Sequence, residues 1–161
     1  MSFIKIRKAT KRDVALILQL IKELAKYEKL SKDVSATKNL LRKWLFGRNA
    51  VAEVLLAFLD GEPAGYTLFF HNFSTFLGKP GIYLEDLFVK PEYRNKGVGK
   101  RLLVEIARIA KKRDCGRLEW SVLNWNAQAI DFYKKLGAKP LDEWTMYRVT
   151  GDELDRLAGK D

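Results

Sequence analysis

The sequence is poor in the residues from which disulfides and metal sites are built. Cys115 is its only cysteine and His71 its only histidine. A single cysteine excludes a disulfide within the chain, and this pair suggests neither a zinc site nor thiol catalysis. We therefore expect no bound metal. Cys115 is interpreted as a small, partly buried side chain, and His71 as a ring at the end of a strand.

Long apolar runs are also absent. No stretch approaches the roughly 20 residues that cross a bilayer, and the opening MSFIKIRKAT has no apolar stretch long enough for a signal peptide. We expect no membrane partner and a cytoplasmic location. The chain has 161 residues, of which 47% are hydrophobic and 31% are charged. This composition is typical of one globular domain over residues 1–161, and not of a disordered chain.

Positive charge is present in excess. The net charge is +10 at pH 7, with the basic excess in residues 1–50 and 94–139 and a net acidic balance in 51–93 and 140–161. Such a distribution attracts polyanions such as nucleic acid, and it suits equally a small ligand with several phosphates. No pattern of interleaved aromatic and basic residues is evident, so we do not expect a nucleic-acid partner.

Hydrophobic periodicity predicts alternating strands and helices, and hence an α/β or α+β fold. Strands are expected at residues 3–7, 50–60, 63–70, 81–89, 117–123 and 143–149, and helices at 10–24, 37–46, 97–112 and 126–136. The segments 50–60 and 63–70 should form an antiparallel hairpin, and 81–89 should pair in parallel with 117–123. Thr10 with Asp13, and Thr150 with Glu153, match the spacing of capping boxes.

The stretch LFVKPEYRNKGVGKRLL, residues 87–103, leads from a strand through a basic, glycine-containing turn into a helix. A helix N-terminus presents unpaired backbone N–H groups and the positive end of the helix dipole, so it is suited to an anion. Gly97 and Gly99 allow close approach to the main chain. Positive charge comes from Arg94, Lys96, Lys100 and Arg101. A diphosphate suits this turn, although a helix start with solvated basic residues would show the same pattern.

Two common phosphate-binding loops do not match this turn. A P-loop requires four residues between its glycines and a Ser or Thr after the Lys, but Arg101 follows Lys100. A dinucleotide-binding fingerprint requires a third glycine, but Leu102 stands at that position. ATP and NAD are therefore not the expected ligands.

The segments ELAKYE, YLEDLFV, YRNKGVG and WNAQAIDFYKKLGA together resemble the GCN5-related N-acetyltransferases, in particular the diamine and polyamine acetyltransferase branch. The resemblance implies a mixed central sheet of about six to seven strands, with a splayed pair of parallel strands and flanking helices. It also implies acetyl-CoA as the acetyl donor, direct attack by an amine in a ternary complex, and a homodimer. The order of predicted elements agrees with this family over nearly the whole chain.

The resemblance also assigns coenzyme-binding residues. The backbone of Leu87, Phe88 and Val89 should pair with the pantetheine arm as an added strand, and the turn should cradle the diphosphate. The residues so assigned are Leu87, Phe88, Val89, Arg94, Asn95, Lys96, Gly97, Val98, Gly99, Lys100, Asn126 and Lys135. For Asn126, capping of the following helix would alone explain its presence.

Transfer of an acetyl group from a thioester to an amine needs a base, because a free alkyl amine has a pKa of about 10.4. It also needs an acid for the leaving thiolate and N–H donors for the oxyanion. By resemblance Tyr133 is the acid and Glu85 the base, and a backbone N–H near Leu87 or Val89 stabilises the oxyanion. Glu85 and Asp86 stand in an apolar strand, where regular alternation would send them to opposite faces, Glu85 beside Leu87 and Val89. Glu85 could instead bind the substrate cation or pair with a neighbouring base.

The acceptor site implied by the resemblance contains Tyr27, Glu28 and Glu85, whose carboxylates suit a cationic amine. The segment FSTFLGK, residues 73–79, lacks the acidic residue and tryptophan of polyamine-acetylating members and looks more like relatives that acetylate thialysine. We therefore expect a small basic amine, with spermidine second. Two alternatives stay open, a protein or peptide N-acetyltransferase and a basic nucleic-acid-binding module.

Overall fold

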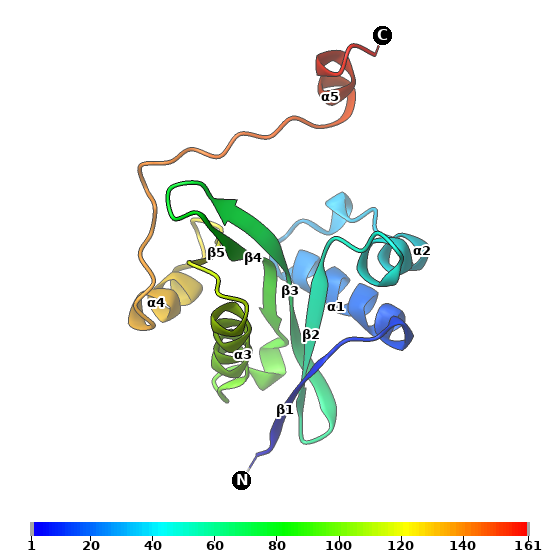
Figure 1. Cartoon of the computed structure of the whole chain (residues 1–161). Coiled ribbons are helices and arrows are strands. Elements are labelled where there is room, and N and C mark those ends of the chain that lie inside the picture. The colour runs from blue at the N-terminus through cyan, green and yellow to red at the C-terminus, as the bar shows by residue number, and fades with distance from the viewer. Residues whose placement is uncertain (1, 161) are drawn as a thin grey trace. The chain divides into compact units, whose positions relative to one another are not determined.

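The computed structural model describes residues 2–160 (Figure 1). The chain divides into two compact units, one up to Ser121 and one from Val122 onward, and each is described by itself. The first unit contains a five-stranded sheet in the order β1-β2-β3-β4-β5. Its strands are β1 Ile4–Lys8, β2 Glu53–Leu59, β3 Glu62–Ser74, β4 Lys79–Val89 and β5 Leu118–Trp120. Its helices are α1 Val14–Tyr27, α2 Lys38–Leu41 and α3 Val98–Lys112.

The strand pairing confirms the predicted hairpin and the predicted parallel pair. The pairs β1–β2, β2–β3 and β3–β4 are antiparallel, whereas the pair β4–β5 is parallel. The expectation of six to seven strands is wrong for the described residues, because the sheet has five. Residues 143–149 form no strand, and Trp144, Met146 and Tyr147 are exposed. Alternation marks a segment able to pair, but a strand forms only where a partner takes its backbone hydrogen bonds.

Helices cover both faces of this sheet (Figure 1). Helices α1 and α2 lie on one face and α3 lies on the other. Helix α2 continues into a π-helical turn, Arg42–Phe46, which together with α2 fills the predicted helix 37–46. The core on the α1 face consists of Ala9, Val14, Ile17, Leu18, Leu20, Leu24, Leu41, Leu45, Val54, Leu56, Tyr66 and Phe88. Helix α3 buries Val98, Leu102, Leu103, Ile106 and Ala110.

The start of α1 is stabilised by the predicted Thr10–Asp13 pair. The Thr10 N–H donates to the Asp13 carboxylate at 2.8 Å, and a 3-10 turn, Lys11–Asp13, precedes the helix. Arg7 on β1 donates two further hydrogen bonds to the same carboxylate, at 2.8 and 2.9 Å. These contacts lower the pKa of Asp13 to about 2. They tie the first strand to the first helix.

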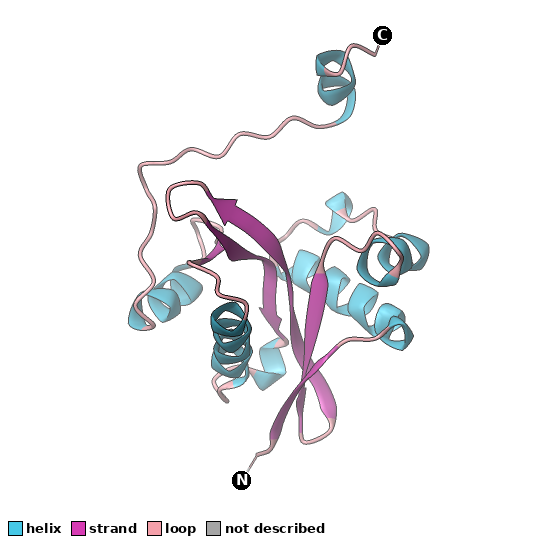
Figure 2. Cartoon of the chain, viewed as in Figure 1, coloured by secondary structure: helices cyan, strands magenta, loops and turns pink. Residues whose placement is uncertain are grey.

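The second unit contains α4 Ala127–Lys135 and α5 Gly151–Leu157, joined by a segment without regular secondary structure (Figure 2). Asn126 caps α4 as predicted, because its side-chain oxygen accepts from the Ala129 N–H at 3.2 Å. Thr150 precedes α5 but makes no side-chain cap hydrogen bond. Glu153 instead pairs with Arg156 at 2.8 Å. The second predicted capping box is therefore wrong.

Candidate active site

The basic turn leads directly into the first turn of α3. Asn95 and Gly97 have positive φ angles, 61° and 86°, and Gly97 is the residue that caps the helix. Left-handed residues alternating with others curl the main chain, so that successive N–H groups converge. The first N–H groups of α3, from Val98 onward, have no partner within the helix. Backbone N–H donors and the exposed Lys96 and Lys100 thus occur together in the turn and the first residues of the helix.

Strand β4 carries a β-bulge at Glu85. In the pairing with β3, Leu84 stands opposite Phe69 and Asp86 opposite Leu68, so Glu85 has no partner. Leu68 and Phe69 are adjacent on β3 and point to opposite faces, and therefore Leu84 and Asp86 also point to opposite faces. Leu68 packs against the α1 core, which places Asp86 on the α1 face. The regular alternation expected from the sequence is wrong at this point.

Beyond the bulge, β4 has an open edge on its β5 side. The parallel ladder ends at the Leu84–Trp120 pair, while β4 continues to Val89. The Lys90 N–H donates to the Ala64 carbonyl at 2.8 Å, so the facing pair Gly65 and Val89 is of the non-hydrogen-bonded kind, with N–H and C=O directed away from each other. Leu87 stands two positions earlier, opposite Thr67, so its N–H and C=O also point away from β3. Within residues 79–121 the parallel pair is thus confirmed over three residue pairs, and β4 extends beyond it; the splay expected from the resemblance stays a prediction.

Three carboxylates and a buried phenol gather on and beside this part of β4. The Tyr66 hydroxyl, fully buried, donates to the Asp86 carboxylate at 2.8 Å. Burial raises the pKa of Asp86, the Tyr66 hydrogen bond lowers it, and the charge of Glu85 raises it. Burial, and then the charge of Asp86, raises the pKa of Glu28. Burial and the neighbouring carboxylates raise the pKa of Tyr66 well above its usual value. We call Glu28, Tyr66, Glu85 and Asp86 the acidic cluster.

Arg94 joins the basic turn to α1. Its Nε donates to the Val89 carbonyl at 2.9 Å. Its guanidinium carbon lies 4.1 Å from the centroid of the Tyr27 ring and 5.9 Å from that of Phe88. Lys90 adds a second link, since its ammonium lies 3.9 Å from the Glu23 carboxylate of α1. The end of β4 is therefore held to the C-terminal half of α1.

The remaining predicted site residues belong to the second unit. Tyr133 lies on α4, half-buried, with its ring 5.6 Å from that of Phe132. Lys135 is exposed and pairs with Asp131 at 3.0 Å. Asn126 caps the same helix. The structure thus brings Tyr27, Glu28 and Glu85 together with the basic turn, and it presents the other three on α4.

Comparison with known proteins decides the family. The sequence pattern of the Acetyltransferase (GNAT) family matches residues 16–138. The chain belongs to this family.

Relatives of this acetyltransferase agree with the branch inferred from its motifs. The thialysine N-epsilon-acetyltransferase of Bos taurus is 43% identical over 173 positions, which cover 99% of this chain and 100% of the relative. The L-ornithine N5-acetyltransferase of Arabidopsis thaliana is 33% identical over 96% of this chain and 88% of the relative. An integron cassette protein from the mobile metagenome of V. cholerae superposes with a TM-score of 0.80, at 29% identity, over 96% of this chain and 97% of the other. The chain is an N-acetyltransferase.

Sequence reasoning missed two members of the acidic cluster of this acetyltransferase. The sequence shows Asp86 as a carboxylate in an apolar strand without indicating its role, and no pattern distinguishes Tyr66. The burial of a carboxylate was a usable signal for Asp86. Tyr66 lies 20 positions earlier, and only the register that sets it opposite Phe88 brings it to Asp86. No spacing rule within the sequence would have found it.

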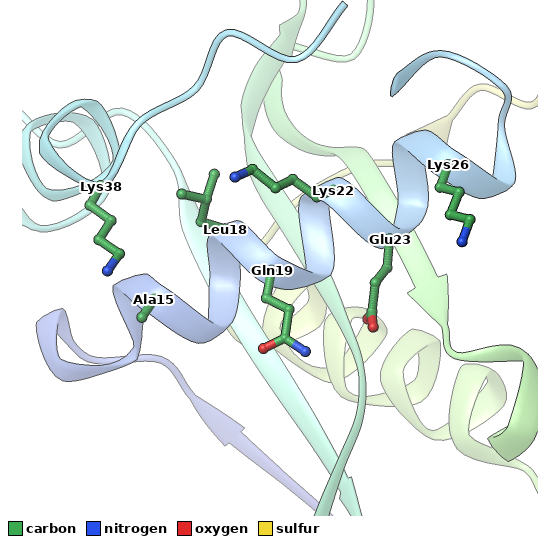
Figure 3. Close-up of a pocket in the computed structure, with 7 residues that line it drawn as sticks. All are labelled: Ala15, Leu18, Gln19, Lys22, Glu23, Lys26 and Lys38. Atoms are coloured by element: carbon green, nitrogen blue, oxygen red, sulfur yellow. The ribbon is translucent and has the colours of Figure 1, made fainter. Parts of the chain in front are cut away.

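A shallow depression of the acetyltransferase lies along α1 and the start of α2 (Figure 3). It is lined by Ala15, Leu18, Gln19, Lys22, Glu23, Lys26 and Lys38, and the figure shows these side chains along α1 and at the start of α2. None of the predicted site residues lines it. Among residues 2–160, no group of three or more His, Cys, Asp or Glu side chains is placed to hold a metal ion, and no helix is long and apolar enough to cross a bilayer.

Proposed function

We propose that this chain transfers the acetyl group of acetyl-CoA to a primary amine of a small basic compound, such as a lysine analogue, a diamine or a polyamine. The observation that carries the proposal is the acidic cluster at the end of β4. Its carboxylates sit beside the open edge of the strand, with raised pKa values for Glu28 and Asp86. A cationic amine would compensate the cost of burying these charges.

The chain offers acetyl-CoA two kinds of contact. The α3 N-terminus and the turn Asn95–Gly99, with positive φ at Asn95 and Gly97, supply converging N–H groups for a diphosphate. The open edge at Leu87 and Val89 supplies backbone groups for an extended amide-containing arm. Members of this family use acetyl-CoA, which supplies the acetyl group as a thioester, and these residues suit it.

The acceptor amine must bind as a cation and react as a neutral nucleophile. Asp86 and Glu28 would hold the ammonium group, with Tyr27 as a neighbouring aromatic surface. Glu85 is exposed at the bulge and would accept the proton, directly or through water. An N–H at Leu87 or Val89 would stabilise the oxyanion. The amine would then attack the thioester carbonyl directly, within a ternary complex, as the resemblance to the family implies.

Tyr133 on α4 is proposed to hold the proton that the departing thiolate takes up. A free phenol, with a pKa near 10, still carries its proton at neutral pH, and because a thiol has a pKa near 8.5, transfer of that proton to the thiolate costs only about 1.5 pKa units. Asn126 and Lys135 would contact the coenzyme arm and its phosphates. These three roles rest on the resemblance of WNAQAIDFYKKLGA to the family.

The printed names of two relatives support a small amino-acid acceptor. Thialysine N-epsilon-acetyltransferase and L-ornithine N5-acetyltransferase both name a side-chain amine as the site of acetylation. We carry this substrate class to the present chain and place spermidine second. A homodimer and a cytoplasmic location complete the proposal.

Incubation of the purified protein with acetyl-CoA and a panel of amines tests the function. The panel contains thialysine, ornithine, lysine, putrescine, spermidine and a lysine-containing peptide, and release of free thiol is followed. Thiol release with thialysine or ornithine that exceeds release with the peptide is expected. Acetylation of peptides, without any of the free amines, would instead support a protein acetyltransferase.

A further inference from the structure

We infer that Arg94 acts as a positioning residue that locks the coenzyme turn to the acceptor side of the site through the Tyr27 ring. This inference rests on the proposed function and deepens it. The resemblance alone gives Arg94 the role of a diphosphate ligand and gives Tyr27 a contact with the amine. The contacts of Arg94 join these two residues into one unit, which we call the Tyr27–Arg94 clamp.

The first contact removes one hydrogen-bonding group from the coenzyme edge. Val89 forms a non-hydrogen-bonded pair with Gly65, so its carbonyl is directed away from β3. Arg94 Nε donates to that carbonyl at 2.9 Å. An incoming arm therefore finds the N–H of Val89 and both groups of Leu87. The Val89 carbonyl is already used to hold Arg94, which fixes the chain between β4 and the turn.

The second contact orients the guanidinium plane. Tyr27 is the last residue of α1, and its ring centroid lies 4.1 Å from the Arg94 guanidinium carbon, well within the range of a cation–π contact. Both side chains are half-buried, so water weakens this contact less than it would at a fully exposed site. The ring thus restricts where Arg94, and with it Asn95 to Gly97, can lie.

The clamp also reaches the acidic cluster. Phe88 lies beneath Arg94 at 5.9 Å and packs edge-on against Tyr66 at 6.4 Å. Tyr66 donates to Asp86, and Glu28 follows Tyr27 in the chain. A displacement of the Tyr27 ring would therefore disturb the turn on one side and the acceptor carboxylates on the other. Tyr27 therefore contributes to coenzyme binding even when no amine is bound, because it positions Arg94 and the turn.

Titration calorimetry with acetyl-CoA, in the absence of amine, tests the clamp. Tyr27→Leu removes the ring but retains every charge and donor of Arg94, and we expect about tenfold weaker acetyl-CoA binding. Tyr27→Phe retains the ring and should restore the affinity to within about twofold. The matched control is Lys22→Ala, an exposed cation on α1, which should bind acetyl-CoA as the wild type does. Thermal unfolding of each variant checks that it is folded.

Arg94→Lys is the second test variant. The lysine keeps the positive charge but has neither the planar guanidinium group nor its Nε. Combined with Tyr27→Leu it should weaken binding no more than the stronger single variant, since both remove the same clamp. Amide hydrogen exchange without ligand should be faster at residues 95–97 in both variants. Full multiplication of the two effects, or unchanged affinity and exchange in Tyr27→Leu, would overturn the inference. A wild-type protein that takes up no acetyl-CoA would overturn the proposed function itself.

Discussion

Asp86 shows most clearly how one residue combines a cost in stability with a use in binding. Its carboxylate is partly buried and close to Glu85 and Glu28, and it accepts a hydrogen bond from Tyr66. Burial of negative charges near one another destabilises the folded state unless a cation joins them. A binding site for an ammonium group has this property, whereas a purely structural carboxylate is usually paired with a base.

Asp86→Asn should therefore impair the acceptor and spare the fold. The amide oxygen still accepts from Tyr66, but the charge is lost, so the KM for the amine should rise about ten- to hundredfold. The affinity for acetyl-CoA should stay the same. The free energy of unfolding at neutral pH should be equal or higher, because a buried charge has been removed. Steady-state kinetics, calorimetry and denaturant unfolding measure the three quantities, and a KM that does not change would remove Asp86 from the acceptor site.

The pH dependence of the same residue has a definite sign. The pKa of Asp86 is raised in the folded state, so its contribution to stability is greatest below the unfolded value of about 3.9 and is lost as the pH rises through the raised pKa. Over this interval the carboxylate forms, and the KM for the amine should fall with rising pH. Asp86→Asn should lack this part of the profile. An identical pH profile in the two proteins would contradict the assignment.

Tyr133 carries the prediction for the chemical step. Tyr133→Phe keeps the ring contact with Phe132 but removes the only proton the side chain can give. Turnover should fall about a hundredfold or more, with little change in acetyl-CoA affinity. Single-turnover rates at saturating acetyl-CoA separate this effect from binding. Undiminished turnover would show that another group protonates the thiolate.

At the scale of elements, the two glycines before and within α3 are not equivalent. Gly97 has a φ of 86°, which side chains disfavour, although its Cβ would meet only Ile4. Gly99 has an ordinary φ, and its Cβ would lie 3.6 Å from Val89 Cγ2, a normal contact. The turn thus requires glycine at Gly97 for backbone conformation and tolerates a methyl group at Gly99.

Gly97→Ala should destabilise the protein by about 1 kcal/mol and weaken acetyl-CoA binding, because the N–H groups of the turn lose their alignment. Gly99→Ala is the matched control and should unfold at the same temperature as the wild type, or slightly above it. Differential scanning calorimetry of both variants, with and without acetyl-CoA, makes the comparison. Equal destabilisation by the two substitutions would show that the left-handed turn is not what the site needs.

The elements themselves were largely predictable, and the exceptions have physical reasons. The helices 97–112 and 126–136 are confirmed as α3 and α4, because an apolar stripe and a glycine or asparagine at the start are local signals. The segment 117–123 yields only Leu118–Trp120, and residues 143–149 yield no strand, since strand length depends on a partner elsewhere. The bulge at Glu85 was invisible because register is not a local property. The family motifs directed attention to Tyr27, Glu28 and Glu85, but not to Tyr66.

At the scale of the whole molecule, the charge distribution bears on the rate of coenzyme capture. The chain carries a net charge of +10, and acetyl-CoA is anionic, so long-range attraction should accelerate their encounter. Stopped-flow measurements should show an association rate that falls severalfold between low salt and about 0.15 M salt, with a smaller change in the dissociation rate. An association rate independent of salt would show that the excess positive charge serves another purpose.

The assembly state is a second prediction at this scale. We expect a homodimer, with a mass by light scattering of twice the 18.6 kDa of one chain. The apolar side chains exposed in the second unit, among them Trp144, Met146 and Tyr147, are candidates for cover by a partner chain. Trp144→Asp should then lower the measured mass towards that of a monomer. A wild-type protein that is monomeric at micromolar concentration would contradict the expectation.

The unpaired residue in β4 has a consequence for how this protein can change over generations. Point substitutions do not change the face of the sheet to which each side chain of β4 points, which is the parity of the strand. Acceptor preference can therefore change by replacement of side chains one at a time. Loss of the Glu85 codon would leave this parity intact as well, because Leu84 and Asp86 would become neighbours in a regular strand and would still point to opposite faces. Asp86 would remain opposite Leu68, on the α1 face. A mutant library selected for activity should therefore accept a shorter strand here only if the Glu85 carboxylate is dispensable for the reaction.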